Sequence, residues 1–322
     1  MRRDVDSFQC ARQHPGARRS EEAFSKTSDT GGQGLATVAR SPSTRPAAGS
    51  AAPLRVGIVN IMPRAENYEP YLTRPLARSP LPVDVVWIRL ESHTYSSSDL
   101  ARIERLYRTY EDATAARPLD GLILTGAPVE ELPYHQVTYW GELAAILTHA
   151  RDAVPSTLGL CWGGMALAQL LGIDKRTLPS KLFGVFEHRN LAPEQGLLGG
   201  ADDRFWCAQS RHSGIDDSAL ERAQDAGLVR LLAHGDESGY SLFQTPDHRY
   251  VMHLGHPEYE PSRLIEEWRR DAALGRTDVG PPRHFDIHAP VNRWRSHCTG
   301  LFSQWLSLLH AARVKRGPAT NE

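Results

Sequence analysis

Short apolar runs rich in β-branched residues alternate with amphipathic stretches from Leu54 onward. Four runs are typical of buried strands, because each is short and is followed by a Pro, Gly or polar turn. Elsewhere the spacing of apolar residues favours helices, and Pro261 stands at a favourable first helical position. The expected strands are 55–61, 83–90, 121–125 and 156–160, and the expected helices are 99–107, 139–153, 261–273 and 294–312. This alternation predicts an α/β fold with a mostly parallel sheet and helices on both faces.

The apolar runs come closer together after residue 181 and predict a small antiparallel extension of the sheet. They are 182–187, 228–234, 240–244 and 250–254. Residues 1–52 show neither helical nor strand periodicity and are rich in Arg, Ser, Gly and Ala, so a disordered tail is expected there. The predicted organisation is this tail, one catalytic domain over 53–312, and a disordered end over 313–322.

Composition and charge narrow the class of protein. Hydrophobic residues make up 40% of the 322 residues, which is enough for a sizeable core. The 37 basic and 38 acidic residues cancel, which predicts binding to neither nucleic acid nor a membrane surface. The four cysteines have neither disulfide nor zinc spacing, so no metal is expected. A cytoplasmic enzyme that acts on small molecules is therefore expected.

The strongest local signal for chemistry is the run Gly-Leu-Cys-Trp-Gly-Gly at 159–164, between a predicted strand and a predicted helix. A nucleophile flanked by small residues at such a junction is typical of a nucleophile elbow. The start of a helix lowers the pKa of a thiol and presents backbone amides to a developing oxyanion. These features favour Cys161 as a nucleophile over a buried cysteine that only packs against the sheet.

The motif His-Pro-Glu at 256–258 offers a base and a residue to orient it. Residues two apart in extended backbone point to the same side, so the imidazole and the carboxylate share a face. His253, in the preceding apolar run, is interpreted as packed in its strand. Cys207 has no elbow-like neighbours and is expected to be inert, and Cys298 is expected in the core.

Several motifs occur together in one order along the chain. They are Val-Asn-Ile-Met-Pro (59–63), Ser-Pro-Leu-Pro-Val-Asp (79–84), Asp-Gly-Leu-Ile-Leu-Thr-Gly-Ala-Pro-Val-Glu (120–130), Val-Thr-Tyr-Trp (137–140), Lys-Leu-Phe-Gly-Val-Phe-Glu-His (181–188), Gly-His-Pro-Glu-Tyr (255–259) and Trp-Arg-Ser-His (294–297). With the elbow, this set resembles the homoserine O-acyltransferase (MetA) family of methionine biosynthesis, within the class I glutamine amidotransferase-like superfamily. The resemblance covers about four fifths of the chain.

The resemblance implies a role for each matching position. Cys161 is the acyl-accepting nucleophile, His256 the proton acceptor and Glu258 the third catalytic residue. The amino-acid-binding positions are Lys181, Ser210 and Arg270. The resemblance further implies acyl transfer from acyl-CoA to homoserine, a homodimer, and no cofactor beyond the CoA co-substrate.

Glu130 falls on the position that sorts acyl donors in the family, with Gly in succinyl-transferring and Glu in acetyl-transferring members. A glutamate fills volume and opposes the carboxylate of succinyl-CoA, and such repulsion in a poorly solvated site costs several kcal/mol. Acetyl-CoA is therefore the predicted donor.

Departures from the family pattern leave alternatives open. Arg64-Ala65 and Tyr68-Glu69-Pro70-Tyr71 replace two lysines and Thr-Glu-x-Gln, and Ala208-Gln209 replaces Pro-His. Homoserine O-succinyltransfer and serine O-acyltransfer remain alternatives, as does a catalytically inactive binding protein. A glutamine amidotransferase-like hydrolase is disfavoured, because Met165 stands where glutaminase elbows place Gln.

Overall fold

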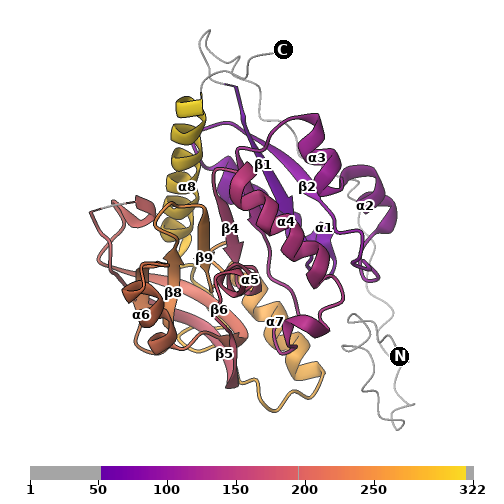
Figure 1. Ribbon diagram of the computed structural model, residues 1–322. Coiled ribbons are helices and arrows are strands. Elements are labelled where there is room, and N and C mark those ends of the chain that lie inside the picture. Colours follow the sequence, from indigo (N-terminus) through magenta and orange to yellow (C-terminus); the bar gives the residue numbers. More distant parts are fainter. Residues whose placement is uncertain (1–51, 195, 317–322) are drawn as a thin grey trace, which may run out of the picture. The chain divides into compact units, whose positions relative to one another are not determined.

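Nine strands form one mixed sheet in the computed structural model, which describes residues 52–194 and 196–316 (Figure 1). The strand order is β2-β1-β3-β4-β9-β8-β7-β5-β6. The first five strands in this order pair in parallel and the rest pair antiparallel. The strands are β1 (Leu54–Val59), β2 (Val83–Ile88), β3 (Gly121–Leu124), β4 (Thr157–Leu160), β5 (Arg176–Asn190), β6 (Arg204–Gly214), β7 (Arg230–Gly235), β8 (Gly239–Gln244) and β9 (Tyr250–His253). The predicted parallel sheet with an antiparallel extension is confirmed.

The helices alternate with the parallel strands and then close the chain. They are α1 (Ala65–Ala77), α2 (Leu100–Leu106), α3 (Tyr110–Ala116), α4 (Trp140–Ala153), α5 (Trp162–Leu170), α6 (Asp217–Asp225), α7 (Pro261–Ala273) and α8 (Arg295–Arg316), with the single-turn 3₁₀ helices η2 (Tyr134–Gln136) and η3 (Gly196–Leu198). None of these described helices is long and apolar enough to cross a membrane.

Helices cover both faces of the sheet, as predicted, and two glycines show this. Leu124 of β3 pairs with Gly159 of β4, so both residues point to the same face. A Cβ on Gly159 would collide with the backbone of α5, which places α5 on that face. Gly121 points to the opposite face, and a Cβ there would lie 2.4 Å from Leu309 of α8. Helix α8 therefore packs on the opposite face of the sheet from α5 (Figure 1).

Helix α1 and the end of helix α8 differ from the sequence-based expectation. Helix α1 was not predicted because it contains Pro70 and Pro75, which disrupt helices in isolation. It forms because Tyr68, Leu72 and Leu76, spaced four apart, bury one stripe against the core. The catalytic domain was predicted to end at 312, but α8 continues to Arg316. The predicted tail over 1–52 lies outside the described residues except for residue 52, as do residues 317–322 of the predicted C-terminal tail.

The parallel strands bring the candidate chemistry to one edge of the sheet. Leu160, the last residue of β4, pairs with His253, the last residue of β9. Cys161 follows β4 directly, His256 lies three residues beyond the end of β9, and Gly126 lies two residues beyond the end of β3. Ligands of open α/β sheets bind at this carboxyl edge.

Candidate active site

Cys161 occupies a strained turn between β4 and α5. Its backbone has φ +52° and ψ −115°, a conformation that residues with side chains rarely adopt. Its amide donates a hydrogen bond of 2.7 Å to the carbonyl of His253 on the neighbouring strand. The thiol is buried, with 5% of the residue exposed. The turn has the features expected of a nucleophile elbow.

The two glycines that flank the elbow are required by close packing. A Cβ on Gly159 would lie 2.4 Å from the carbonyl oxygen of Gly163. A Cβ on Gly163 would lie 2.5 Å from the carbonyl oxygen of Leu124. Both distances are shorter than a real carbon–oxygen contact, so any larger residue would push α5 away from the sheet and move the thiol.

His256 and Glu258 form a buried pair beside the thiol. His256 Nδ1 lies 2.7 Å from Glu258 Oε1, and the two side chains are 3% and 0% exposed. The amide of His256 donates to the carbonyl of Ala208, and its ring stacks on Tyr259 at 4.0 Å. Burial alone would lower the pKa of His256, but the charges of Cys161 and Glu258 and hydrogen bonds to both raise it well above its usual value. The geometry suits a thiolate–imidazolium pair oriented by a carboxylate.

Two stretches of backbone lie beside Cys161, namely the loop after β3 and the start of α5. A Cβ on Gly126 would lie 3.4 Å from Cys161 Cβ and 3.7 Å from His256 Cε1, so the loop after β3 runs directly past the nucleophile. Trp162 and Gly163 begin α5, where amides lack acceptors within the helix. Amides at the start of α5 and in the loop at Gly126 are therefore the candidate donors to an oxyanion.

Glu130 follows the same loop and is partly buried. It accepts a hydrogen bond from the backbone of His212, and its Oε2 is buried without a partner in the described part of the chain. Burial raises the pKa of Glu130 to about 7, although the positive charges of Lys181, His256 and Arg211 act to lower it. Glu130 is therefore a partly buried residue with one buried carboxyl oxygen, and its carboxyl group lies within electrostatic reach of His256.

Arg211 of β6 is a buried cation near the nucleophile that sequence reasoning missed. Its guanidinium donates to the side chain of Gln209 and to two backbone carbonyl oxygens. None of these partners is a carboxylate. The pKa of Arg211 is lowered by burial and raised by the charges of Cys161 and Glu130, which places both acidic groups within its electrostatic reach. Its charge stabilises the anionic forms of both groups.

Two of the three predicted amino-acid-binding residues, Ser210 and Lys181, belong to a buried cluster that reaches Cys161, whereas the side chain of Arg270 is 44% exposed. The carbonyl of Ser210 is 3.9 Å from Cys161 Sγ, and its hydroxyl donates to Glu267 Oε2 at 2.5 Å. Lys181 Nζ lies 2.7 Å from Asp271 Oδ2 and 3.7 Å from Glu267 Oε2. A cation, an anion and a hydroxyl group therefore converge next to the nucleophile.

The two carboxylates of this cluster were missed by sequence reasoning. Glu267 and Asp271 lie one turn apart on α7, and the half-exposed Arg270 binds Asp271 at 2.8 Å. Burial raises the pKa of Glu267, but Lys181, Arg263 and Arg270 together lower it to about 2. The available signal was two acidic residues on the otherwise apolar stripe of an amphipathic helix.

A second buried group lies behind the elbow, where Cys207, His253 and His297 bring their ligand atoms within 4.8 Å of one another. The amide of Gly255 donates to His253 Nδ1, so the neutral ring carries its proton on Nε2, the atom facing His297. Nε2 is therefore a hydrogen-bond donor and not a metal ligand. Burial raises the pKa of Cys207 and of Cys298. His253, Cys207 and Cys298 are buried, where the sequence predicted packing residues.

A cavity of about 620 Å³ opens on the side of Glu130. Tyr134 and Trp140 line it with their rings 4.5 Å apart, and Trp162 lies 5.9 Å from Tyr134. Lys175, also in the lining, donates to the carbonyl of Glu130. Residues that line the cavity thus contact Trp162 at the start of α5 and Glu130 after the loop that follows β3.

Comparisons with known proteins identify the family of this chain. The model of the homoserine O-succinyltransferase family matches residues 36–315. Relatives named homoserine O-acetyltransferase from Bacillus subtilis and Geobacillus kaustophilus are 35% and 39% identical, each over 79% of this chain and 85% of its own length.

Similarity to solved structures concerns the fold alone. A glutamine amidotransferase from Thermotoga maritima is similar with a TM-score of 0.55 and 14% identity, over 80% of this chain and 99% of that one. A putative GMP synthase subunit from Thermoplasma acidophilum has a TM-score of 0.53, over 83% and 100%. The predicted glutamine amidotransferase-like fold is confirmed, and the chain belongs to the homoserine O-succinyltransferase family of transferases.

Proposed function

We propose that the protein transfers an acetyl group from acetyl-CoA to the side-chain hydroxyl of L-homoserine through a thioester on Cys161. The observation that carries this proposal is the juxtaposition of two sites. The proposed catalytic triad, Cys161, His256 and Glu258, lies against the charged cluster that contains Ser210 and Glu267. A nucleophile thus stands next to groups suited to a small zwitterion.

In the first half-reaction, His256 takes the proton of Cys161 and the thiolate attacks the thioester carbonyl of acetyl-CoA. Backbone amides of the elbow and of the loop at Gly126 stabilise the oxyanion. The carbon–sulfur bond to CoA breaks, and the CoA thiolate takes the proton from His256. Glu258 fixes the imidazole tautomer and stabilises the imidazolium.

In the second half-reaction, neutral His256 takes the proton of the acceptor hydroxyl as the oxygen attacks the acyl-enzyme. The bond from carbon to Cys161 breaks, the thiol regains the proton, and the ester leaves. Both steps are acyl transfers in which no electron is gained or lost, so these residues balance the reaction without a cofactor.

The acceptor cluster favours an amino acid over a simple alcohol. Lys181 and Arg270 offer cations to an α-carboxylate, and Arg can do so through two hydrogen bonds. Glu267, whose pKa is lowered to about 2 after burial and its cationic neighbours are both counted, remains charged and can accept an α-ammonium group. A zwitterion adds one charge of each sign to the cluster and leaves its net charge unchanged.

The donor is assigned from Glu130 and the neighbouring cavity. Glu130 supplies bulk and partial negative charge near His256, which favours a small neutral acetyl group. The cavity lined by Tyr134 and Trp140 offers aromatic faces and space for part of the CoA moiety.

The test is release of free CoA thiol from acetyl-CoA, measured with no acceptor and with homoserine, serine or threonine. We expect about one equivalent released as a burst without acceptor and turnover with homoserine, and neither for Cys161→Ala. Turnover only with serine would identify serine as the acceptor in place of homoserine. Turnover only with succinyl-CoA would identify succinyl-CoA as the donor in place of acetyl-CoA. Hydrolysis of glutamine, or no release with any acyl-CoA, would refute the proposal.

A further inference from the structure

Tyr68 contacts the proposed catalytic triad in a way that the family resemblance does not explain. It lies on α1, in the segment that departs from the family pattern, and 2% of it is exposed. Its hydroxyl donates a hydrogen bond to Glu258 Oε1. The same oxygen lies 2.7 Å from His256 Nδ1. Tyr68, Glu258, His256 and Cys161 therefore form one continuous hydrogen-bonded chain.

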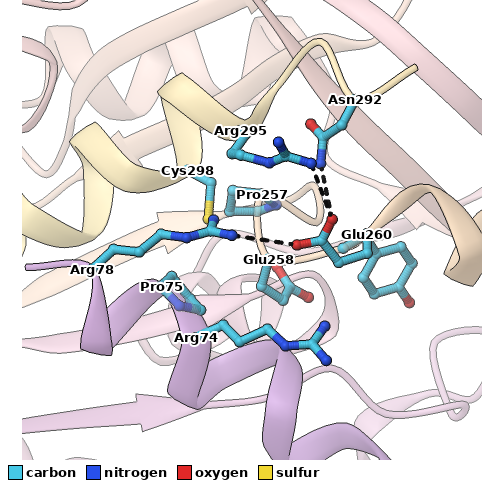
Figure 2. A pocket seen from close by; sticks show the side chains of 10 residues that line it. Arg74, Pro75, Arg78, Pro257, Glu258, Glu260, Asn292, Arg295 and Cys298 are labelled. Atoms are coloured by element: carbon cyan, nitrogen blue, oxygen red, sulfur yellow. Dashed lines mark hydrogen bonds and ion pairs between the residues drawn. The ribbon is translucent and has the colours of Figure 1, made fainter. Parts of the chain in front are cut away.

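No other described side chain holds the Glu258 carboxylate in place. Its second oxygen, Oε2, is buried and has no partner among the described residues. Two arginines that line the same small cavity bind another carboxylate, since Arg78 and Arg295 each lie 3.7 Å from Glu260. Figure 2 shows these arginines converging on Glu260 across the small cavity that Glu258 also lines. Among the residues that the structure describes, His256 and Tyr68 are therefore the only hydrogen-bond partners of the Glu258 carboxylate.

Tyr68 is itself held rigidly. Its stripe on α1 is buried in the core, and its ring lies 5.6 Å from Tyr71 and 6.4 Å from Tyr259. Tyr259 in turn stacks on His256. Burial, followed by the charge of Glu258, raises the pKa of Tyr68 well above its usual value, so the hydroxyl remains a donor.

We infer that Tyr68 is a positioning residue for the catalytic triad and that it acts on Cys161 through Glu258 and His256. This inference deepens the proposed function and rests on it for the identity of the reaction. The physical reason is that a carboxylate with one fixed and one free oxygen can rotate, and rotation would break its bond to His256. A hydrogen bond from a neutral donor to a charged group contributes more than one between neutral groups, so its loss is measurable.

The test substitutes Tyr68→Phe, which removes only the hydroxyl, beside Tyr71→Phe as the matched control. Tyr71 is half-buried on the same helix, and its hydroxyl bonds Ser262 and not Glu258. The first readout is the rate of iodoacetamide alkylation of the peptide containing Cys161, followed by mass spectrometry. We expect about a 10-fold decrease for Tyr68→Phe and less than about a 2-fold change for Tyr71→Phe.

A double-mutant cycle separates positioning from general loss of structure. In a Glu258→Gln background, adding Tyr68→Phe should change the alkylation rate by less than about 2-fold, because the route through Glu258 is already broken. With acetyl-CoA, Tyr68→Phe should lower the rate of acyl-enzyme formation about 10-fold and leave KM within about 2-fold. Unchanged rates in Tyr68→Phe, or equal losses with and without Glu258, would overturn the inference.

The two proposals fail separately. Alkylation needs neither acyl donor nor acceptor, so it tests Tyr68 even if the substrates are different. If Tyr68→Phe slows alkylation only when Glu258 is present, and no acyl-CoA releases free thiol, the proposed reaction is rejected and the positioning role is retained.

Discussion

Removal of the charge on Glu130 should change donor selectivity in a pH-dependent way. Burial raises the pKa of Glu130 to about 7, so the carboxyl group is half protonated at neutral pH. Glu130→Gln keeps the volume and removes the charge, whereas Glu130→Gly removes both. The pair therefore separates repulsion from bulk.

The magnitude follows from two competing free energies. A succinyl carboxylate about 4 Å from an ionised Glu130 would be repelled by about 4 kcal/mol at an effective dielectric constant of about 20. Protonation of Glu130 avoids that repulsion and costs about 0.4 kcal/mol at pH 7 and about 2 kcal/mol at about pH 8.5. Protonation is the cheaper route in this range. The fixed penalty of several kcal/mol expected from sequence is therefore too large near neutral pH.

The assay is the ratio of kcat/KM for acetyl-CoA to that for succinyl-CoA, because a ratio cancels the shared titration of the catalytic residues. In the wild-type protein we expect the ratio to rise about 15-fold between about pH 7 and about pH 8.5. Glu130→Gln should abolish this slope, and Glu130→Gly should also increase succinyl-CoA use at every pH. A wild-type ratio that does not change with pH, or a slope retained in Glu130→Gln, would refute the reasoning.

Three further predictions concern the elbow and the core. Cys161→Ala should abolish acyl transfer, and His256→Ala should slow both half-reactions by about 10²–10⁴-fold in single-turnover assays; wild-type turnover without the thiol would contradict a covalent route. Gly163→Ala should destabilise the protein by about 1–3 kcal/mol in urea unfolding, because its Cβ would lie 2.5 Å from a backbone oxygen at the end of β3. Burial lowers the pKa of His188 and of His297 from 6.5 to about 3, so both are neutral in the folded state. Below about pH 6.5 the unfolded chain binds protons on these rings and the folded chain does not, so the stability of the folded state falls as the pH falls toward about 3. A melting temperature that does not change between about pH 7 and about pH 4.5 would contradict this prediction.

The fold could be predicted where the periodicity is strong, and it could not where packing overrides local preference. Four of the five strands that pair in parallel (β1 to β4) and helix α7 were predicted to within about two residues, because buried strands and amphipathic helices repeat with fixed periods. Helix α1 was missed because its two prolines oppose a helix, and burial of Tyr68 and its stripe outweighs them. Helix α6 begins at Asp217 within a polar stretch that gave little signal.

The candidate site was predictable only in part, because different residues depend on information of different range. Cys161 carries a local signal, since its glycines and the strand–helix junction stand together in the sequence. The partners that set charge and orientation lie far away, with Glu267 57 residues from Ser210 and Tyr68 190 residues from Glu258. No period or spacing connects such pairs, and only the folded chain brings them into contact. The candidate catalytic residues can therefore be predicted from the sequence, whereas the residues that set their charge and orientation are found only in the structure.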